Sequence, residues 1–345
     1  GLKKKILVIG PFATNMPQKY CDAGGSVIMG EPEFFFLKNR DLNVIENKKH
    51  ITFEHNFNLD DLPYPDWESV IKNNKTSLLF GTEKSLPILA TRGCPYSCFK
   101  YCVYPLQQGR KPRHREAKKI LDELEYWNKK LNIKMFIFRD PVFSINRKHT
   151  IAFCKKVIEE NLDITFMVET HLNNLDDEMI PLLRTAGLEL VYVGVESSSN
   201  FVLKDMKRFT VEQDKQYEVI KKCEDAGIKV KTMFIIGNPE DNEDTIIKSI
   251  EYAKYLPSLY SQFSVFTPYP GTPAYNEFKD IITESKLENF NQYNLTFKHK
   301  NLSKKNISDL KSLAYFKFYF NFKKIFQILK YFLKSKYEKK NQWVG

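Results

Sequence analysis

Six apolar, β-branched-rich runs alternate with helix-like segments through the middle of this chain. The runs cover residues 86–91, 134–140, 164–170, 190–197, 229–237 and 260–270. This alternation predicts parallel βαβ units, and the near-continuous apolar composition predicts strands that are buried on both faces. A doubly wound open sheet would satisfy the pattern. Polar, chemically active residues follow the strands, however, which favours an α/β fold built as a partial (βα)6 barrel.

The two ends of the chain differ from this middle part. Residues 1–35 indicate two strands and one short helix, the remnant of an α/β domain, without the G-x-G-x-x-G fingerprint. Residues 36–85 form a proline-stiffened connector in this interpretation. We expect the barrel to cover residues 86–285 and a basic, aromatic helical tail to cover residues 286–345.

The net charge of +11 is concentrated at one end. Residues 301–345 hold eleven lysines and two acidic residues, so the body of the chain is nearly neutral. A basic groove for nucleic acid is therefore not indicated. The tail is amphipathic, with Ile325, Ile328, Leu329 and Phe332 on one helical face and Lys323, Gln327, Lys330 and Lys334 on the other. Such a helix could lie on an anionic membrane surface or pack on the barrel with solvated lysines.

Three of the six cysteines lie within nine positions, at Cys94, Cys98 and Cys102. The sequence shows no apolar run of ~20 residues and no signal peptide. We therefore expect a cytoplasmic protein, in which a tight cysteine cluster indicates metal binding or catalysis rather than a disulfide. A zinc site usually has four ligands, whereas three thiolates suit an iron–sulfur cluster with one open iron. A structural metal knuckle or free thiols remain alternatives.

The chain resembles radical SAM enzymes, and specifically the group whose barrel follows a cobalamin-binding domain. The resemblance runs from about residue 86 to 275, through the motifs TRGCPYSC…YCVYP, FIFRDPVFSINRK, ITFMVET, GVESSS, FIIGNPEDNEDT and PYPGTPAY, with GEPE and LPYPDW upstream. It implies a 4Fe-4S cluster held by Cys94, Cys98 and Cys102, with S-adenosylmethionine (SAM) chelating the free iron. One electron from a flavodoxin- or ferredoxin-type reductant would then cleave SAM and release a 5′-deoxyadenosyl radical.

The cysteine spacing departs from the family pattern at one place. The usual gaps are three residues and then two, but here both gaps are three residues long. Tyr101 keeps the aromatic position before the last cysteine, so Lys100 is interpreted as an insertion. The resemblance also makes Tyr101 a cofactor-binding residue.

The resemblance further assigns polar residues at the strand ends to SAM. Asp140 would bind the amino group, although an N-cap or a salt-bridge partner is an equal alternative. Glu169 and Glu196 would reach the ribose hydroxyls or the amino group. Their alternative is an internal ion pair with Arg139 or Arg184. The backbone at Ile236, Gly237 and Pro239 would flank the adenine.

The expected function is therefore a radical SAM enzyme that acts on an unidentified small-molecule or lipid-like substrate. One alternative is a cobalamin-dependent methyltransferase, or an enzyme of ring closure or rearrangement. Another is a non-catalytic iron–sulfur or zinc protein. The chain contains no D-x-H-x-x-G motif for a cobalt ligand, so we expect cobalamin binding only in a longer parent chain. The tail would allow peripheral membrane contact.

Overall fold

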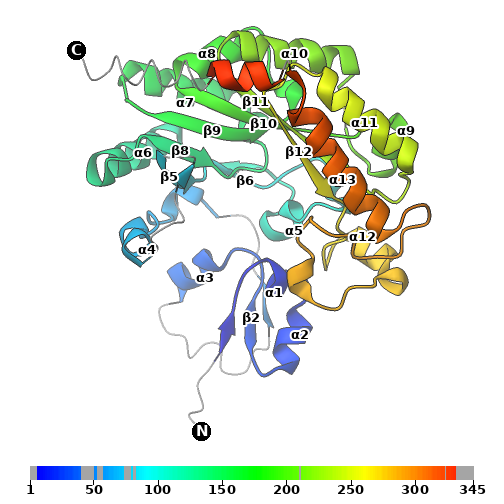
Figure 1. The fold of residues 1–345 in the computed structure, drawn as a ribbon. Coiled ribbons are helices and arrows are strands. Elements are labelled where there is room, and N and C mark those ends of the chain that lie inside the picture. Colours follow the sequence, from blue (N-terminus) through cyan, green and yellow to red (C-terminus); the bar gives the residue numbers. More distant parts are fainter. Residues whose placement is uncertain are drawn as a thin grey trace.

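A seven-stranded sheet forms the body of the molecule (Figure 1). The computed structural model describes residues 6–39, 50–52, 57–73, 79–80, 83–209, 211–322 and 324–331. The strands lie in the order β12-β11-β10-β9-β8-β5-β4, with bounds β4 (Leu79–Phe80), β5 (Glu83–Ile88), β8 (Met135–Phe138), β9 (Thr165–Thr170), β10 (Leu188–Glu196), β11 (Lys229–Ile236) and β12 (Tyr260–Val265). All pairs are parallel except β4 with β5. The predicted six-stranded partial barrel is confirmed.

Amphipathic helices connect the strands and cover the outer face of the sheet (Figure 1). They are α6 (Ala117–Leu131), α7 (Arg147–Glu159), α8 (Met179–Thr185), α9 (Asn200–Asp205), α10 (Gln213–Asp225) and α11 (Glu243–Tyr255). In α6, Ile120, Leu124 and Trp127 recur at helical spacing and are all buried. Gly187 follows α8 with a φ of +105°, where a Cβ atom would lie 2.4 Å from the Ile164 carbonyl oxygen. Only glycine allows this tight entry into β10.

Helix α13 (Lys304–Tyr319) protects the edge strand β12, which it crosses in Figure 1. Ile307, Leu310, Ala314 and Phe318 form its buried face. The Tyr319 hydroxyl donates to the Ser261 carbonyl (2.9 Å) and accepts from the Ser261 N–H (3.2 Å). These bonds occupy backbone groups that an unprotected edge would offer to another strand.

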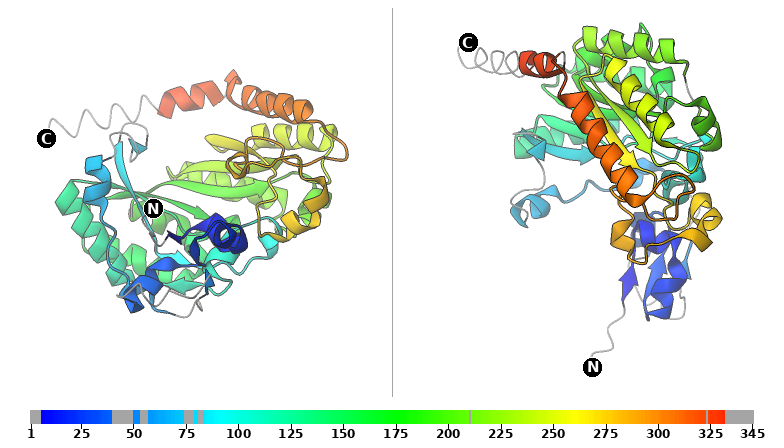
Figure 2. Two further views of the ribbon diagram at one scale, coloured as in Figure 1. Left: turned by 90° about the horizontal axis from the view of Figure 1, so that it is seen from below. Right: turned by 45° about the vertical axis from the view of Figure 1, so that its right-hand side comes forward.

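A small N-terminal unit lies on the side of the sheet opposite to α8 and α10 (Figures 1 and 2). Its parallel strands are β1 (Leu7–Val8), β2 (Ser26–Ile28) and β3 (His50–Ile51), and its helices are α1 (Pro11–Asn15), α2 (Pro17–Asp22) and α3 (Pro32–Lys38). β3 comes from the range that the sequence analysis assigned to the connector. The remaining short elements are α4 (Trp67–Asn73), β6 (Thr91–Arg92), α5 (Tyr104–Gln108), β7 (Arg113–His114) and α12 (Pro273–Glu277), with 3₁₀ helices at Leu59–Asp61, Ser97–Lys100, Phe143–Ile145, Leu172–Asn174, Lys279–Ile281 and Leu287–Asn289.

A buried ion-pair network ties this unit to the β6–β7 hairpin. Both carboxylate oxygens of Glu31 lie 2.7 Å from a guanidinium group, one of Arg92 and one of Arg113. Arg92 also contacts Glu33 at 2.7 Å. Glu31 is only 4% exposed, so its charge is compensated by these arginines rather than by water. The network therefore holds residues 31–33 against the strand that leads into the cysteine loop, which we define as residues 93–103.

Replacement of Glu31 should destabilise the fold far more than replacement of Glu33. Glu31→Gln removes the carboxylate that bridges Arg92 and Arg113, so Arg113 loses its carboxylate partner and Arg92 keeps only the half-exposed Glu33. This loss of a buried partner should lower the free energy of unfolding by about 3–5 kcal/mol. The side chain of Glu33 is 44% exposed, so Glu33→Gln should cost about 1 kcal/mol or less. Urea unfolding followed by circular dichroism measures both. Equal losses in the two variants would contradict the special role of Glu31.

Candidate functional site

The three clustered cysteines line one pocket of about 150 Å³ at the carboxyl ends of the strands, here called the cysteine pocket. Cys94 and Cys98 are buried and Cys102 is half-buried. Carboxyl ends of parallel strands meet at one edge of a sheet, so residues distant in sequence converge here. The lining comprises Cys94, Tyr96, Cys98, Tyr101, Cys102, Tyr104, Pro141, Val142, Glu169, Thr170, His171, Tyr192, Gly194, Glu196, Arg208 and Met233.

The cysteine loop is folded back on itself by its own backbone. Gly93 has a φ of +91°, and a Cβ atom there would lie 2.3 Å from the Lys111 carbonyl oxygen. The Cys94 N–H donates to the Gly109 carbonyl at 3.2 Å. Further along, the Cys102 N–H donates to the Cys98 carbonyl at 3.2 Å. These bonds fold the loop so that all three cysteines line one pocket, and only glycine fits the starting turn.

The thiols lie in surroundings that disfavour charge. Burial raises the pKa of Cys94, and burial together with the neighbouring Cys98 raises the pKa of Cys102 to about 12. A cation lies beside one of the thiols, since Arg208 Nη1 is 3.8 Å from Cys98 Sγ. Within the described residues, no three His, Cys, Asp or Glu side chains converge closely enough to hold a single metal ion. The cysteines thus share a pocket without converging on one point.

Glu196 is held in a strained conformation at the end of β10. Its φ is +66°, and the register of β10 against β11 shifts between Gly194 and Glu196. Left-handed backbone at a non-glycine residue is rare and recurs at functional sites. Glu196 Oε1 lies 3.4 Å from Arg208 Nη2, which also donates to the Gly194 carbonyl at 3.0 Å. A Cβ atom on residue 194 would lie 2.4 Å from that Glu196 oxygen, so glycine makes room for the pair.

Two carboxylates therefore face the pocket in poorly solvated positions. Burial raises the pKa of Glu196, an effect that Arg208 opposes and Glu169 strengthens. Burial also raises the pKa of Glu169, whose opposing charges are Arg139 and Lys231. The ion-pair alternative from the sequence named Arg139 or Arg184, but the partner of Glu196 is Arg208.

The other residues assigned to SAM lie outside the lining of this pocket. Asp140 is fully buried, and its Oδ1 accepts the Ala90 N–H at 2.8 Å, which supports the start of the β6 strand. Burial raises the pKa of Asp140 to about 7. Ile236 is buried at the end of β11, and Gly237 and Pro239 follow it. The SAM-binding roles of these residues stay predictions.

Sequence reasoning missed Arg208, the cation that pairs with Glu196. It follows α9 in the stretch MKRFT, which matches no motif used above. The sequence did offer one signal for it, namely a basic residue that follows the strand ending in Glu196. Both nitrogens of His171, another lining residue, are satisfied, since Nε2 donates to the Phe209 carbonyl (3.1 Å) and Nδ1 accepts the Asn173 N–H (3.2 Å). Burial lowers the pKa of His171 to about 4, so the ring is neutral.

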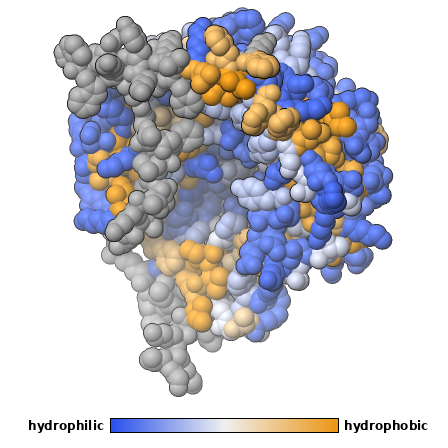
Figure 3. Space-filling model, in the orientation of Figure 1, coloured by the Kyte–Doolittle hydropathy of each residue, from blue (hydrophilic) through white to orange (hydrophobic). Residues whose placement is uncertain are grey.

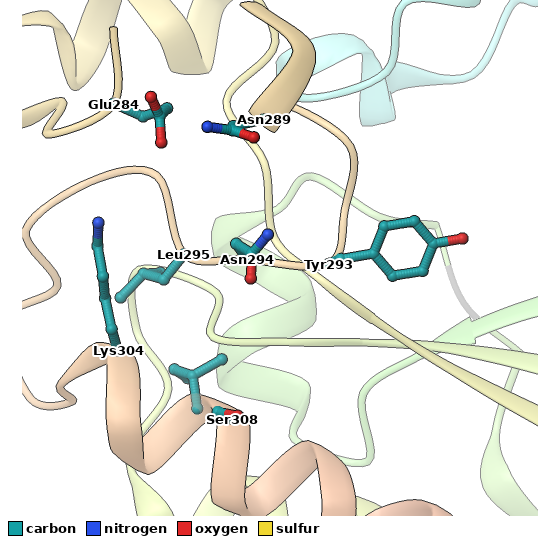
Figure 4. A pocket seen from close by; sticks show the side chains of 8 residues that line it. Glu284, Asn289, Tyr293, Asn294, Leu295, Lys304 and Ser308 are labelled. Carbon is teal, nitrogen blue, oxygen red and sulfur yellow. The ribbon is translucent and has the colours of Figure 1, made fainter. Parts of the chain in front are cut away.

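A second pocket, of about 200 Å³, lies between α13 and the loop before it (Figure 4). Its lining is Glu284, Asn289, Tyr293, Asn294, Leu295, Lys304, Ile307 and Ser308. Lys304 extends toward Glu284 in Figure 4, and Glu284 Oε1 accepts the Lys286 N–H at 2.9 Å. None of these residues lines the cysteine pocket, and the Glu284 contact belongs to a local turn.

Comparison with known proteins identifies the barrel. Residues 88–253 match the model of the radical SAM superfamily. An uncharacterized methyltransferase of Pyrococcus horikoshii is 26% identical over 92% of this chain and 73% of its own length. Bacteriochlorophyllide d C-8(2)-methyltransferase of Chlorobaculum tepidum is 30% identical over 68% of this chain and 53% of its own length. An anaerobic magnesium-protoporphyrin IX monomethyl ester cyclase of Rubrivivax gelatinosus is 27% identical over 80% of this chain.

Solved structures show the same fold. The cobalamin-dependent SAM radical enzyme OxsB, with aqua-cobalamin and SAM bound, superposes with a TM-score of 0.66 at 15% identity, over 89% of this chain and 53% of that one. The chain spans about half the length of the cyclase, of the Chlorobaculum relative and of OxsB. The parallel half-barrel, the cysteine loop after its first strand and the match over residues 88–253 have one explanation: this chain belongs to the radical SAM superfamily.

Proposed function

We propose that this chain cleaves SAM reductively at a 4Fe-4S cluster held by Cys94, Cys98 and Cys102, and thereby starts radical chemistry on a small-molecule or lipid-like substrate. One observation carries the proposal. Three thiols and two carboxylates, the half-buried Glu169 and the buried Glu196, line a single pocket at the carboxyl edge of a six-stranded half-barrel. The superfamily implies this cluster and SAM, and its members require a substrate and a reductant.

The donor set fits the cluster better than it fits zinc. Zinc draws its ligands onto one ion at about 2.0–2.3 Å, whereas each cysteine of a 4Fe-4S cluster binds a different iron and can stand further from the others. The three thiols share a pocket but do not converge in this way. The high pKa values of Cys94 and Cys102 mean that metal binding must release protons. When bound, the cluster would supply the electron for SAM cleavage.

The chain's own groups would bind and orient SAM. The Glu196 carboxylate faces the pocket and could accept hydrogen bonds from the amino group or the ribose hydroxyls, as could Glu169. Tyr101 is half-buried and lines the pocket with the thiols and Glu196, so it would help to keep water from the reacting atoms. Asp140 would act by holding the backbone at Ala90.

The backbone after β11 completes the proposed SAM site. Ile236, Gly237 and Pro239 would flank the adenine there. Gly237 adopts a φ of +71°, and a Cβ atom on it would lie 2.9 Å from Ile307 Cδ1 on α13. Because residue 237 has no room for a side chain, it would contact the flat adenine ring through its backbone.

Methyl transfer is the second candidate function. The relatives in Pyrococcus horikoshii and Chlorobaculum tepidum are named methyltransferases, and OxsB is a cobalamin-dependent enzyme. The Rubrivivax relative is a cyclase, which keeps ring closure open. The pocket carries apolar lining residues beside its carboxylates, such as Val142 and Met233, so a substrate with apolar character would suit it.

We further propose a cytoplasmic protein that is served by a flavodoxin- or ferredoxin-type reductant and touches membranes at its periphery. None of the helices in the described residues combines the length and apolar character that a bilayer crossing requires. The neutral body of the chain supports no nucleic-acid partner.

The helix after α13 supports the membrane contact. Lys324 is buried and its Nζ donates to the carbonyls of Leu256 and Ser258. The apolar side chains turn outward instead, with Phe322, Phe326 and Leu329 exposed by 94%, 69% and 55%. Figure 3 shows hydrophobic surface at this end of the molecule. Exposed aromatic rows beside lysines suit an anionic lipid surface. Lys323, Phe332 and Lys334 of the predicted tail pattern lie outside the described residues.

The cysteine assignment predicts selective loss of iron. Alanine at Cys94, Cys98 or Cys102 should each remove most of the iron and sulfide that the anaerobically reconstituted chain binds. Cys154→Ala, on the buried face of α7, is the control and should keep it. Iron per chain is measured by colorimetric assay, and 5′-deoxyadenosine formation then separates an enzyme from a scaffold. Iron lost from the Cys154 variant but kept in Cys98→Ala would refute the assignment.

The Glu196 assignment predicts weaker SAM binding with an intact cluster. Glu196→Ala should cost about 1.5–3 kcal/mol of SAM affinity, the range for a hydrogen bond to a charged group. Isothermal titration calorimetry on the iron-loaded variant measures the affinity. Glu240→Ala removes a surface carboxylate that pairs with Lys300 and should bind SAM as the original chain does. Unchanged affinity in Glu196→Ala would remove this residue from the site.

The 345-residue chain should not retain cobalamin tightly. In its described part, the N-terminal sheet has three strands of two or three residues, a small surface on which to hold so large a cofactor. The sequence also lacks the D-x-H-x-x-G motif. Gel filtration of the reconstituted chain with cobalamin, followed by its visible spectrum, tests this. Stoichiometric retention would contradict the expectation and make methyl transfer the first choice.

A further inference from the structure

Lys100, the extra residue of the cysteine loop, forms two ion pairs. Lys100 Nζ lies 3.3 Å from Asp205 Oδ1 at the end of α9 and 3.3 Å from Glu277 Oε2 at the end of α12. Its side chain is 11% exposed, the lowest value among the lysines that form ion pairs in the described part of the chain. A longer loop has more conformations to lose on ordering. The ion pairs of Lys100 offset that entropy cost within the loop itself.

The same segment after α9 contacts the cysteine loop at two further points. Arg208 donates from Nη1 to Cys98 Sγ at 3.8 Å. The Phe209 ring lies nearly parallel to the Tyr96 ring at 6.4 Å. Alternate residues of the loop, Tyr96, Cys98 and Lys100, therefore meet Phe209, Arg208 and Asp205 in reversed order. Residues 205–209, here called the clamp segment, run antiparallel to the loop and contact its middle part.

His171 fixes one end of this clamp segment to the sheet. Its ring lies 5.3 Å from the Tyr96 ring and 5.4 Å from the Phe209 ring. Its Nε2 also donates to the Phe209 carbonyl at 3.1 Å. Arg208 is fixed from the other side, through Glu196 and the Gly194 carbonyl at the end of β10. The clamp segment is thus anchored to two strands and can hold the loop in one place.

Arg208 is placed to act on the electronics of a bound cluster. A cation that donates to a ligand sulfur stabilises the more negative, reduced state, so it raises the reduction potential. The Glu196 carboxylate, 3.4 Å away, pairs with the Arg208 guanidinium on the side that faces the sheet. The distance from this charge to Cys98 depends on how firmly the loop is held.

Building on the proposed function, we propose that Lys100 is a positioning residue: its ion pairs lock the lengthened loop onto residues 205–209 and press Cys98 against Arg208, which sets the reduction potential of the cluster. Lys100 therefore both lengthens the loop and supplies the charge that holds the lengthened loop in place.

The apoprotein tests the clamp without any cluster. Iodoacetamide labelling followed by peptide mass spectrometry reports the alkylation rate of Cys98, which is 7% exposed. Lys100→Met and Asp205→Asn should each raise that rate about fivefold through local opening. Lys222→Met, which removes an exposed ion pair with Asp177 on the outer helices, should not. Rates equal to that control would overturn the clamp.

The loaded protein tests the effect on the cluster. Spectroelectrochemical titration should give a lower reduction potential for Lys100→Met and for Arg208→Met, whereas Arg208→Lys should recover part of the shift. The double variant should shift little beyond Arg208→Met alone, since both changes act through one contact. An unchanged potential in Lys100→Met would overturn the link to Arg208. If the original chain takes up no cluster, the proposed function fails, and the alkylation rates still decide the clamp.

Discussion

The ion pair between Glu196 and Arg208 joins the two halves of the candidate site. Glu196 belongs to the sheet, and its Oε1 lies 3.4 Å from Arg208 Nη2. The other terminal nitrogen of Arg208, Nη1, faces the cysteine loop and lies 3.8 Å from Cys98 Sγ. The two side chains are only 12% and 10% exposed, so each charge depends on the other and on the dipoles around them. That dependence explains the positive φ of Glu196 and the need for glycine at residue 194. Backbone strain is tolerated where the surrounding structure over-determines it.

A second buried charge network sets the other boundary of the site. Glu31 of the N-terminal unit is paired with Arg92, two residues before the first clustered cysteine, and with Arg113. The start of the cysteine loop is thus fixed from outside the barrel, and its middle is fixed by residues 205–209 from inside. Both contacts are electrostatic and partly desolvated, which makes them directional. The loop between them has little freedom despite its additional residue.

Much of the fold could be read from local patterns. The six apolar runs became β5, β8, β9, β10, β11 and β12, because strands buried on both faces leave a continuous apolar signature. Gly187 and Gly227 adopt positive φ directly after helices α8 and α10, where glycine is the usual residue. The very short strands were harder, since β3 has only two residues and belongs to a sheet whose other strands lie over twenty residues upstream. No periodicity can develop over two residues.

The sequence by itself determined the parallel half-barrel, the superfamily and the three cysteines, because each is written in contiguous motifs or in a repeating period. Only the tertiary structure decided which charges meet. Arg208 pairs with Glu196, although the sequence analysis named Arg139 or Arg184, and Lys100 reaches Asp205, more than a hundred residues away. Lys324 turns inward while its aromatic neighbours turn out, the reverse of what amphipathic spacing suggests. Such pairings depend on how strands and loops from distant segments converge in space, and no local pattern records that geometry.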